Sequence, residues 1–116
     1  MTKIKWNMVE NSKSEGIFVI EAQEKLVIQE NTINNNYYGL VLIGSKGKIK
    51  NNQIVDNYTA GILTEKETEA VIVNNLISKN MTTGIIIKAP SMPVLKSNCI
   101  VDNNMFQVQM EGHAKK

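Results

Sequence analysis

The chain has 116 residues, a formal net charge of +2 and one cysteine. This length limits it to one domain, which we expect to span residues 1–116. The lone Cys99 excludes an internal disulfide framework and indicates a reducing compartment. All 13 basic residues are lysines, and arginine is the residue preferred for bidentate contacts with phosphate and guanine, so the composition argues against a nucleic-acid partner.

The N-terminal segment Met-Thr-Lys-Ile-Lys-Trp-Asn lacks the apolar run of a signal peptide. No apolar run elsewhere approaches the roughly 20 residues that a membrane-spanning helix needs. These features predict an intracellular, cytoplasmic protein without a membrane partner. We expect it to be part of a larger assembly, cytoskeletal or other.

A short motif, Asn-x-Ile-x-x-Asn followed by glycine, recurs along the chain. The three full copies are Asn31–Ile33–Asn36–Gly39, Asn52–Ile54–Asn57–Gly61 and Asn75–Ile77–Asn80–Gly84. A fourth copy, Asn98–Ile100–Asn103, keeps the spacing and lacks the glycine. The first asparagines follow one another at steps of 21, 23 and 23 residues (52 − 31, 75 − 52, 98 − 75), a period typical of solenoids.

Apolar residues recur at equivalent positions of each repeat and predict three short strands per coil. The columns are Ile4, Ile28, Ile49, Ile72, Leu95, then Val9, Ile33, Ile54, Ile77, Ile100, and after the glycine Ile17, Leu40, Ile62, Ile85, Val108. No helical period of useful length is present. The pattern predicts an all-β fold, a parallel β-helix of about five coils of 21–23 residues, with repeats over residues 4–110 and a tail at residues 111–116.

The repeated asparagines predict two ladders of stacked side-chain amides. Asparagine tolerates the left-handed backbone of a sharp corner, and its amide can hydrogen-bond to the equivalent amide one coil away. The predicted ladder residues are Asn31, Asn52, Asn75, Asn98 and Asn36, Asn57, Asn80, Asn103, with Asn7 extending the first. The repeat glycines are expected where φ is positive or the backbone is crowded.

The string Asn-x-Ile-x-x-Asn-x-x-x-Gly-Ile-x-Ile resembles the parallel β-helix repeat, also called the carbohydrate-binding and sugar-hydrolase repeat. The segment Gly84-Ile85-Ile86-Ile87, followed by Ser91-x-Pro93-Val94-Leu95-x-x-Asn98, resembles the β-helix region of F-box substrate receptors and related scaffolds. The resemblance covers residues 4–110 and implies a right-handed coil. The repeat occurs in enzymes and in non-catalytic scaffolds, so it implies a fold more than an activity.

Few residues are suited to catalysis. The only two aspartates, Asp56 and Asp102, occupy the same position two coils apart with Lys79 between them. Their expected separation of about 9.6 Å, twice the strand spacing, lies near the upper limit for an inverting glycosidase pair. We favour an Asp–Lys–Asp surface ladder over such a pair, and expect no catalytic, cofactor-binding or metal-binding residue.

A partner-binding face is predicted on the sheet that follows the glycines. Strict alternation would point Phe18, Val41, Leu63 and Ile86 outward as an exposed apolar stripe. The ends of the repeat array, which have no helical lid, should also need covering. We therefore expect a non-catalytic β-helix scaffold whose partners are other protein subunits, docked on the stripe or capping the ends. The alternative is a carbohydrate-binding or polysaccharide-processing β-helix fragment, whose platform would be Tyr37, Tyr38 and Tyr58.

Overall fold

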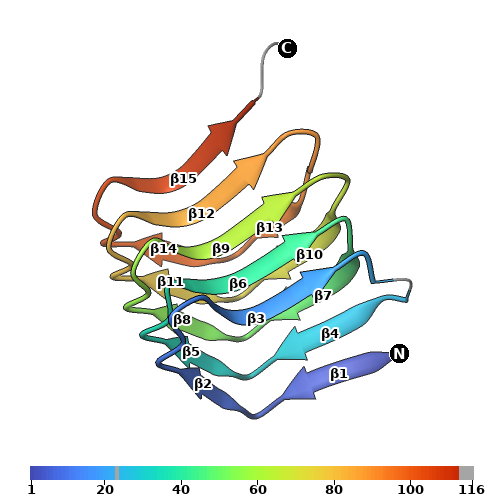
Figure 1. The fold of residues 1–116 in the computed structure, drawn as a ribbon, viewed down its shortest axis with the longest axis horizontal. Helices are drawn as coiled ribbons and strands as arrows, with labels where there is room; N and C mark the ends of the chain where they lie inside the picture. Colours follow the sequence, from blue (N-terminus) through green and yellow to red (C-terminus); the bar gives the residue numbers. More distant parts are fainter. Residues whose placement is uncertain (23, 113–116) are drawn as a thin grey trace.

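A computed structural model describes residues 1–22 and 24–112. Over these residues the chain forms fifteen β-strands and no helix, wound into a stack of coils (Figure 1). The same residues therefore contain no helix that could cross a membrane.

Each coil contributes one strand to each of three parallel sheets, and every sheet has five strands. Sheet A contains β1 (Thr2–Lys5), β4 (Leu26–Gln29), β7 (Lys46–Lys50), β10 (Glu69–Val73) and β13 (Val94–Lys96). Sheet B contains β2 (Met8–Glu10), β5 (Thr32–Asn34), β8 (Gln53–Val55), β11 (Leu76–Ser78) and β14 (Cys99–Val101). Sheet C contains β3 (Glu15–Ile20), β6 (Tyr38–Ile43), β9 (Ala60–Glu65), β12 (Thr83–Lys88) and β15 (Phe106–Glu111).

The predicted apolar columns pair in register through each sheet. In sheet A, Ile28 pairs with Ile49 and Ile49 with Ile72, and the other two columns are paired in the same way in sheets B and C. The middle residues of the columns are fully buried and form one continuous core along the axis. The structure thus confirms the all-β parallel β-helix of five coils.

The two predicted asparagine ladders run along two corners of the solenoid. Asn57 is typical: its Oδ1 accepts from the Asn36 backbone N–H at 3.1 Å, and its Nδ2 donates to Asn80 Oδ1 at 2.9 Å and to the Ile33 carbonyl at 3.2 Å. One amide therefore joins three coils. The left-handed conformation, however, belongs to the residue before each ladder asparagine, such as Asp56 with φ of 58°.

The repeat glycines are required by crowding between coils. A Cβ on Gly39 would lie 2.6 Å from the Gly61 carbonyl oxygen, 2.9 Å from Ile54 Cγ2 and 3.0 Å from Asn57 Nδ2. Real Cβ atoms do not approach backbone oxygens this closely. Because all three of these atoms belong to the next coil, a Cβ on Gly39 would point at that coil, and only glycine fits at this step between Tyr38 and Leu40.

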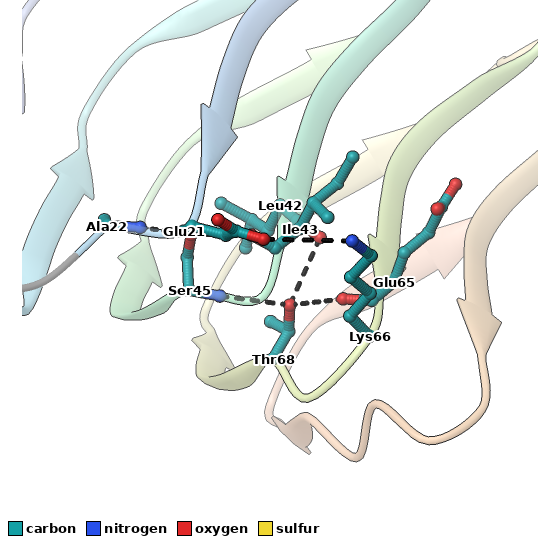
Figure 2. Close-up of polar contacts among 8 residues, drawn as sticks. All are labelled: Glu21, Ala22, Leu42, Ile43, Ser45, Glu65, Lys66 and Thr68. Carbon is teal, nitrogen blue, oxygen red and sulfur yellow. Dashed lines mark hydrogen bonds and ion pairs between the residues drawn. The ribbon is translucent and has the colours of Figure 1, made fainter.

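A ladder of hydroxyl groups lines the third corner, between sheets C and A (Figure 2). Thr68 Oγ1 lies 3.2 and 2.7 Å from the carbonyl oxygens of Leu42 and Glu65, which share its single O–H donor, and it accepts from the Ser45 backbone N–H at 3.4 Å. Ser91 occupies the equivalent place one coil later and contacts Thr64 Oγ1 at 2.8 Å. We call Ser45, Thr68 and Ser91 the hydroxyl ladder; the sequence motif gave no signal for it.

Candidate functional site

The predicted apolar stripe does point away from the main core, but most of it is not exposed. Val41, Leu63 and Ile86 are 2%, 5% and 7% exposed, and only Phe18, at 49%, is open to solvent. The three buried residues form a second cluster with Ala60, against which Tyr38 and Ile43 pack. The prediction of an exposed stripe over four coils is therefore wrong for three of its four residues.

Contacts across the outer face of sheet C explain this burial. Tyr38 precedes Gly39 and Val41 follows Leu40, and both side chains belong to the same outer cluster, whereas Leu40 belongs to the main core. The strands of sheet C are visibly curved (Figure 1). The outward side chains of β6, β9 and β12 pack against one another in this cluster, which removes them from water.

The outer face of sheet A carries a groove instead. Its volume is about 550 Å³, and its lining residues are Met1, Lys25, Leu26, Val27, Lys46, Gly47, Lys48, Glu69, Ala70, Val71, Met92 and Val94. Outward side chains of neighbouring strands pair in register across it, as Val27 does with Lys48 and Lys48 with Val71. Val71 and Val94 remain 37% and 56% exposed. The groove therefore has an apolar floor that is open to solvent.

Lysines dominate the charge around this groove. The lysines on the outer face of sheet A and its entry turns are Lys3, Lys5, Lys25, Lys46, Lys48, Lys50 and Lys96. Within the described residues none of them lies in an ion pair, since the three pairs present use the N-terminus, Lys66 and Lys88. Lys46, Lys48 and Lys50 alternate along β7, about 6.6 Å apart at the rise of a strand. We call this surface, the groove with its surrounding lysines, the basic groove.

The hydroxyl ladder positions one wall of the basic groove. Ser45, Thr68 and Ser91 immediately precede Lys46, Glu69 and Met92, which line the groove. Their hydroxyls hold the backbone at the entry of β7 and β10 and ahead of β13, through bonds such as that from Ser91 Oγ to the Lys88 carbonyl at 2.8 Å. Buried hydroxyls that are fully bonded restrict the local backbone, so the wall residues start from defined positions.

The predicted tyrosine platform is formed at the corner between sheets B and C. Tyr37 and Tyr58 stack with ring centroids 5.8 Å apart and an interplanar angle of 22°, while Tyr38 meets Tyr37 edge-on at 5.5 Å. A hollow of about 490 Å³ lies beside the stack, lined by Ser12, Lys13, Asn35, Asn36, Tyr37, Asp56, Tyr58 and Met81. Tyr37 and Tyr58 are both exposed.

The acidic residues do not assemble into a reactive cluster in the described residues. Asp56, Lys79 and Asp102 occupy the same position of successive coils, as the sequence predicted, and their backbone there is left-handed. No ion pair within 4 Å joins these three side chains, so the predicted surface ladder is not ion-paired. No group of three or more His, Cys, Asp or Glu side chains in residues 1–22 and 24–112 is placed to hold a metal ion. Cys99 is exposed, as expected for an outward position on β14.

Sequence reasoning missed the basic groove although a signal was present. The run Lys46-Gly47-Lys48-Ile49-Lys50 alternates lysine with small or apolar residues, which is the pattern of a strand with one basic face. The column of core isoleucines identifies only the inner face of the sheet. Reading the outward residues of all five sheet A strands together would have revealed the excess of lysine.

Comparison with curated proteins and with solved structures finds no match to this chain. Comparison with protein families finds one described as the right handed beta helix region, which matches residues 1–115. That match covers nearly all of the chain and agrees with the three parallel sheets. The chain belongs to the right-handed β-helix family.

Proposed function

We propose that this protein is a non-catalytic scaffold that binds other proteins, and that the basic groove of sheet A is its docking surface. The observation that carries the proposal is the combination of an exposed apolar floor with lysines that have no ionic partner in the described residues. This moves the expected partner from the outer face of sheet C, which is closed, to that of sheet A.

Charge complementarity indicates the kind of segment that would bind. Lys25, Lys46 and Lys48 line the groove together with a single carboxylate, Glu69. Val27 and Val71 supply floor contacts that a purely ionic ligand would leave exposed to water. A partner segment with apolar side chains flanked by carboxylates satisfies both features, because the apolar groups leave water and the carboxylates meet the ammonium groups.

A peptide-binding experiment tests the proposal. The probe is a short synthetic peptide with a central pair of leucines flanked by glutamates, with fluorescence anisotropy as the readout. We expect Lys46→Glu/Lys48→Glu to weaken binding by about tenfold or more, which is about 1.4 kcal/mol. Raising the salt from about 0.05 M to about 0.5 M should weaken the wild-type complex as well.

The control variant Lys13→Glu/Lys79→Glu makes the same change of net charge away from sheet A. It should bind the peptide within about twofold of wild type, because these exposed lysines lie outside sheet A and do not line the groove. Equal losses in both double variants would contradict a specific groove. A specific groove would also be contradicted if a DNA oligonucleotide or a phosphatidylserine vesicle bound as tightly as the peptide and its affinity were unchanged by Val71→Thr.

The second candidate function is carbohydrate binding at the tyrosine platform. It is favoured by the stacked pair Tyr37 and Tyr58 beside a hollow that also presents Asp56 and Asn35. Aromatic faces pack against the apolar faces of sugar rings, while carboxylate and amide oxygens accept hydrogen bonds from hydroxyls. The F-box type of scaffold and the polysaccharide-processing activity implied by the sequence resemblance remain predictions within these two candidates.

A glycan array separates the second candidate from the first. Carbohydrate binding predicts a defined glycan that binds wild type and is lost in Tyr37→Ala/Tyr58→Ala, while Lys46→Glu/Lys48→Glu leaves it unchanged. A uniformly negative array would remove the carbohydrate candidate. The peptide-binding experiment would then be the remaining test of the scaffold proposal.

A further inference from the structure

The last coil departs from the repeat at one position. Gly16, Gly39, Gly61 and Gly84 occupy the same place in the first four coils, and Gln107 occupies it in the fifth. Gln107 follows Asn103, the final asparagine of the second ladder, on the entry to β15. From the geometry around it we propose that Gln107 is a built-in terminator, which completes the second ladder and blocks any further coil from stacking in register.

The amide of Gln107 reproduces the hydrogen bonds that a following coil would make. Within the stack, Asn103 Oδ1 accepts from the Asn80 backbone N–H at 3.0 Å and from Asn80 Nδ2 at 2.8 Å. Gln107 Oε1 accepts from the same two groups of Asn103, at 3.2 and 2.8 Å. The oxygen of one side chain therefore takes the place of the missing asparagine.

The nitrogen of the same amide replaces a backbone contact. In the stack, the N–H of Asn104 donates to the Asn80 carbonyl at 3.2 Å. Gln107 Nε2 donates to the Asn103 carbonyl at 3.1 Å. Asn103 is thus as fully bonded as an interior member of its ladder.

The Cβ of Gln107 provides the block. A Cβ built on each repeat glycine points at the next coil and lies 2.6–2.9 Å from the carbonyl oxygen at the same position there. A sixth coil in the same register, such as the first coil of a second copy, would bring its Gly16 carbonyl equally close to Gln107 Cβ. The polar groups at the end of the second ladder are satisfied and the approach of a further coil is obstructed, so head-to-tail growth in register stops here.

The first coil carries a matching departure. Ser12 stands at the start of the second ladder, where the other coils have asparagine, and its backbone N–H donates to Asn36 Oδ1 at 3.0 Å. Serine has no amide oxygen to accept from a preceding asparagine. In the first ladder, by contrast, Asn7 and Asn98 keep the repeat residue at the two ends. Restoring both altered positions should therefore make the two end faces complementary.

Three variants of the full chain, compared with wild type, test the terminator by analytical ultracentrifugation and small-angle X-ray scattering. Gln107→Gly removes the Cβ and should self-associate end to end, lengthening the particle by about 24 Å per added copy at the strand spacing of five coils. Gln107→Ala keeps the Cβ and should stay in the wild-type association state. Ser12→Asn/Gln107→Gly should associate at a concentration about tenfold lower than Gln107→Gly.

Amide hydrogen exchange tests the ladder cap independently of association. The Asn103 backbone N–H should exchange about tenfold faster in Gln107→Ala than in wild type, because its acceptor is removed. The proposal is overturned if Gln107→Gly and the double variant keep the wild-type association state, or if Gln107→Ala associates as readily as Gln107→Gly. An unchanged exchange rate of the Asn103 N–H in Gln107→Ala would overturn the capping role. This measurement does not depend on whether the glycine variants fold.

Discussion

The outer faces of sheets A and C both carry apolar residues, but those of sheet C are buried whereas those of sheet A are exposed to solvent. In sheet C, Val41 and Leu63 are almost fully buried, whereas in sheet A, Val71 is 37% exposed. All three point away from the main core. An outward direction therefore does not settle whether a side chain meets water, and the local curvature of the sheet decides it.

The difference lies in the contacts on each face. In sheet C, Tyr38 and Val41 lie on either side of Gly39 and Leu40 and pack together in the outer cluster. In sheet A the residues around Ile49 and Ile72 alternate inward and outward without interruption. That face stays open, with lysines beside its valines. Burial on the closed face contributes to stability, and the open face is the docking surface proposed above.

The largest effect should come from placing a charge on each face. Leu63→Lys should lower the free energy of unfolding by about 4 kcal/mol, because the ammonium would lie in the apolar cluster of Val41 and Ile86 without a partner. Val71→Lys should change it by less than about 0.5 kcal/mol. Urea unfolding followed by circular dichroism measures both, and similar losses in the two variants would contradict the distinction between the faces.

The second-largest loss of stability should come from substituting the glycine at the bend of sheet C. Gly39→Ala should cost about 3 kcal/mol, since its Cβ would meet the Gly61 carbonyl at 2.6 Å within a packed stack. The comparison variant is Gly44→Ala, where φ is +57° and the nearest atom lies 3.5 Å away. Only backbone strain applies there, so about 1 kcal/mol is expected. Thermal unfolding midpoints should rank the two variants in that order; the reverse order would show that crowding does not shape sheet C.

Removing one hydroxyl from the hydroxyl ladder, at the corner that leads into sheet A, should cause a smaller loss of stability. Thr68→Val keeps the shape of the side chain and removes the hydroxyl that bonds two carbonyls and one N–H, so a loss of about 1–2 kcal/mol is expected. Thr32→Val, on the half-buried outer face of β5, should cost less than about 0.5 kcal/mol. Chemical denaturation gives both values. A neutral Thr68→Val would mean that the ladder does not support the groove wall.

The smallest effect should come from the surface ion pairs. Lys66→Ala removes the contact with Glu21 at 3.8 Å, in which both side chains are 64% exposed, and should change the free energy of unfolding by less than about 0.5 kcal/mol. The same measurement in about 1 M salt should leave wild-type stability nearly unchanged. A loss above about 1 kcal/mol would indicate that this corner depends on charge rather than on its hydroxyls.

The repeat pattern predicted the strands and their register because each coil repeats the same inward residues. Ile28, Ile49 and Ile72 must stack, since any other register would place polar residues in the core. The asparagine ladders followed for a similar reason: a buried amide needs partners, and the only equivalent amides lie one coil away. These relations are periodic, so they can be read along the chain.

The burial of the outward residues could not be read in this way. Strict alternation correctly predicted that Val41 and Leu63 point outward, but their predicted exposure failed because outward neighbours from other strands pack against them. Likewise, the missing glycine of the last repeat was visible, but the role of Gln107 depends on the space beyond Asn103. Such features arise from contacts between coils at a bend or at an end, where the period is broken.

The sequence by itself therefore determined the solenoid, its five coils, the core columns and the ladder residues, because all of these depend on equivalent residues meeting at each coil. Only the tertiary structure decided which outer face is closed, which carries the open basic groove, and how the second ladder ends at Gln107. The physical reason is that exposure depends on curvature and on neighbours from other coils, and a one-dimensional pattern contains neither.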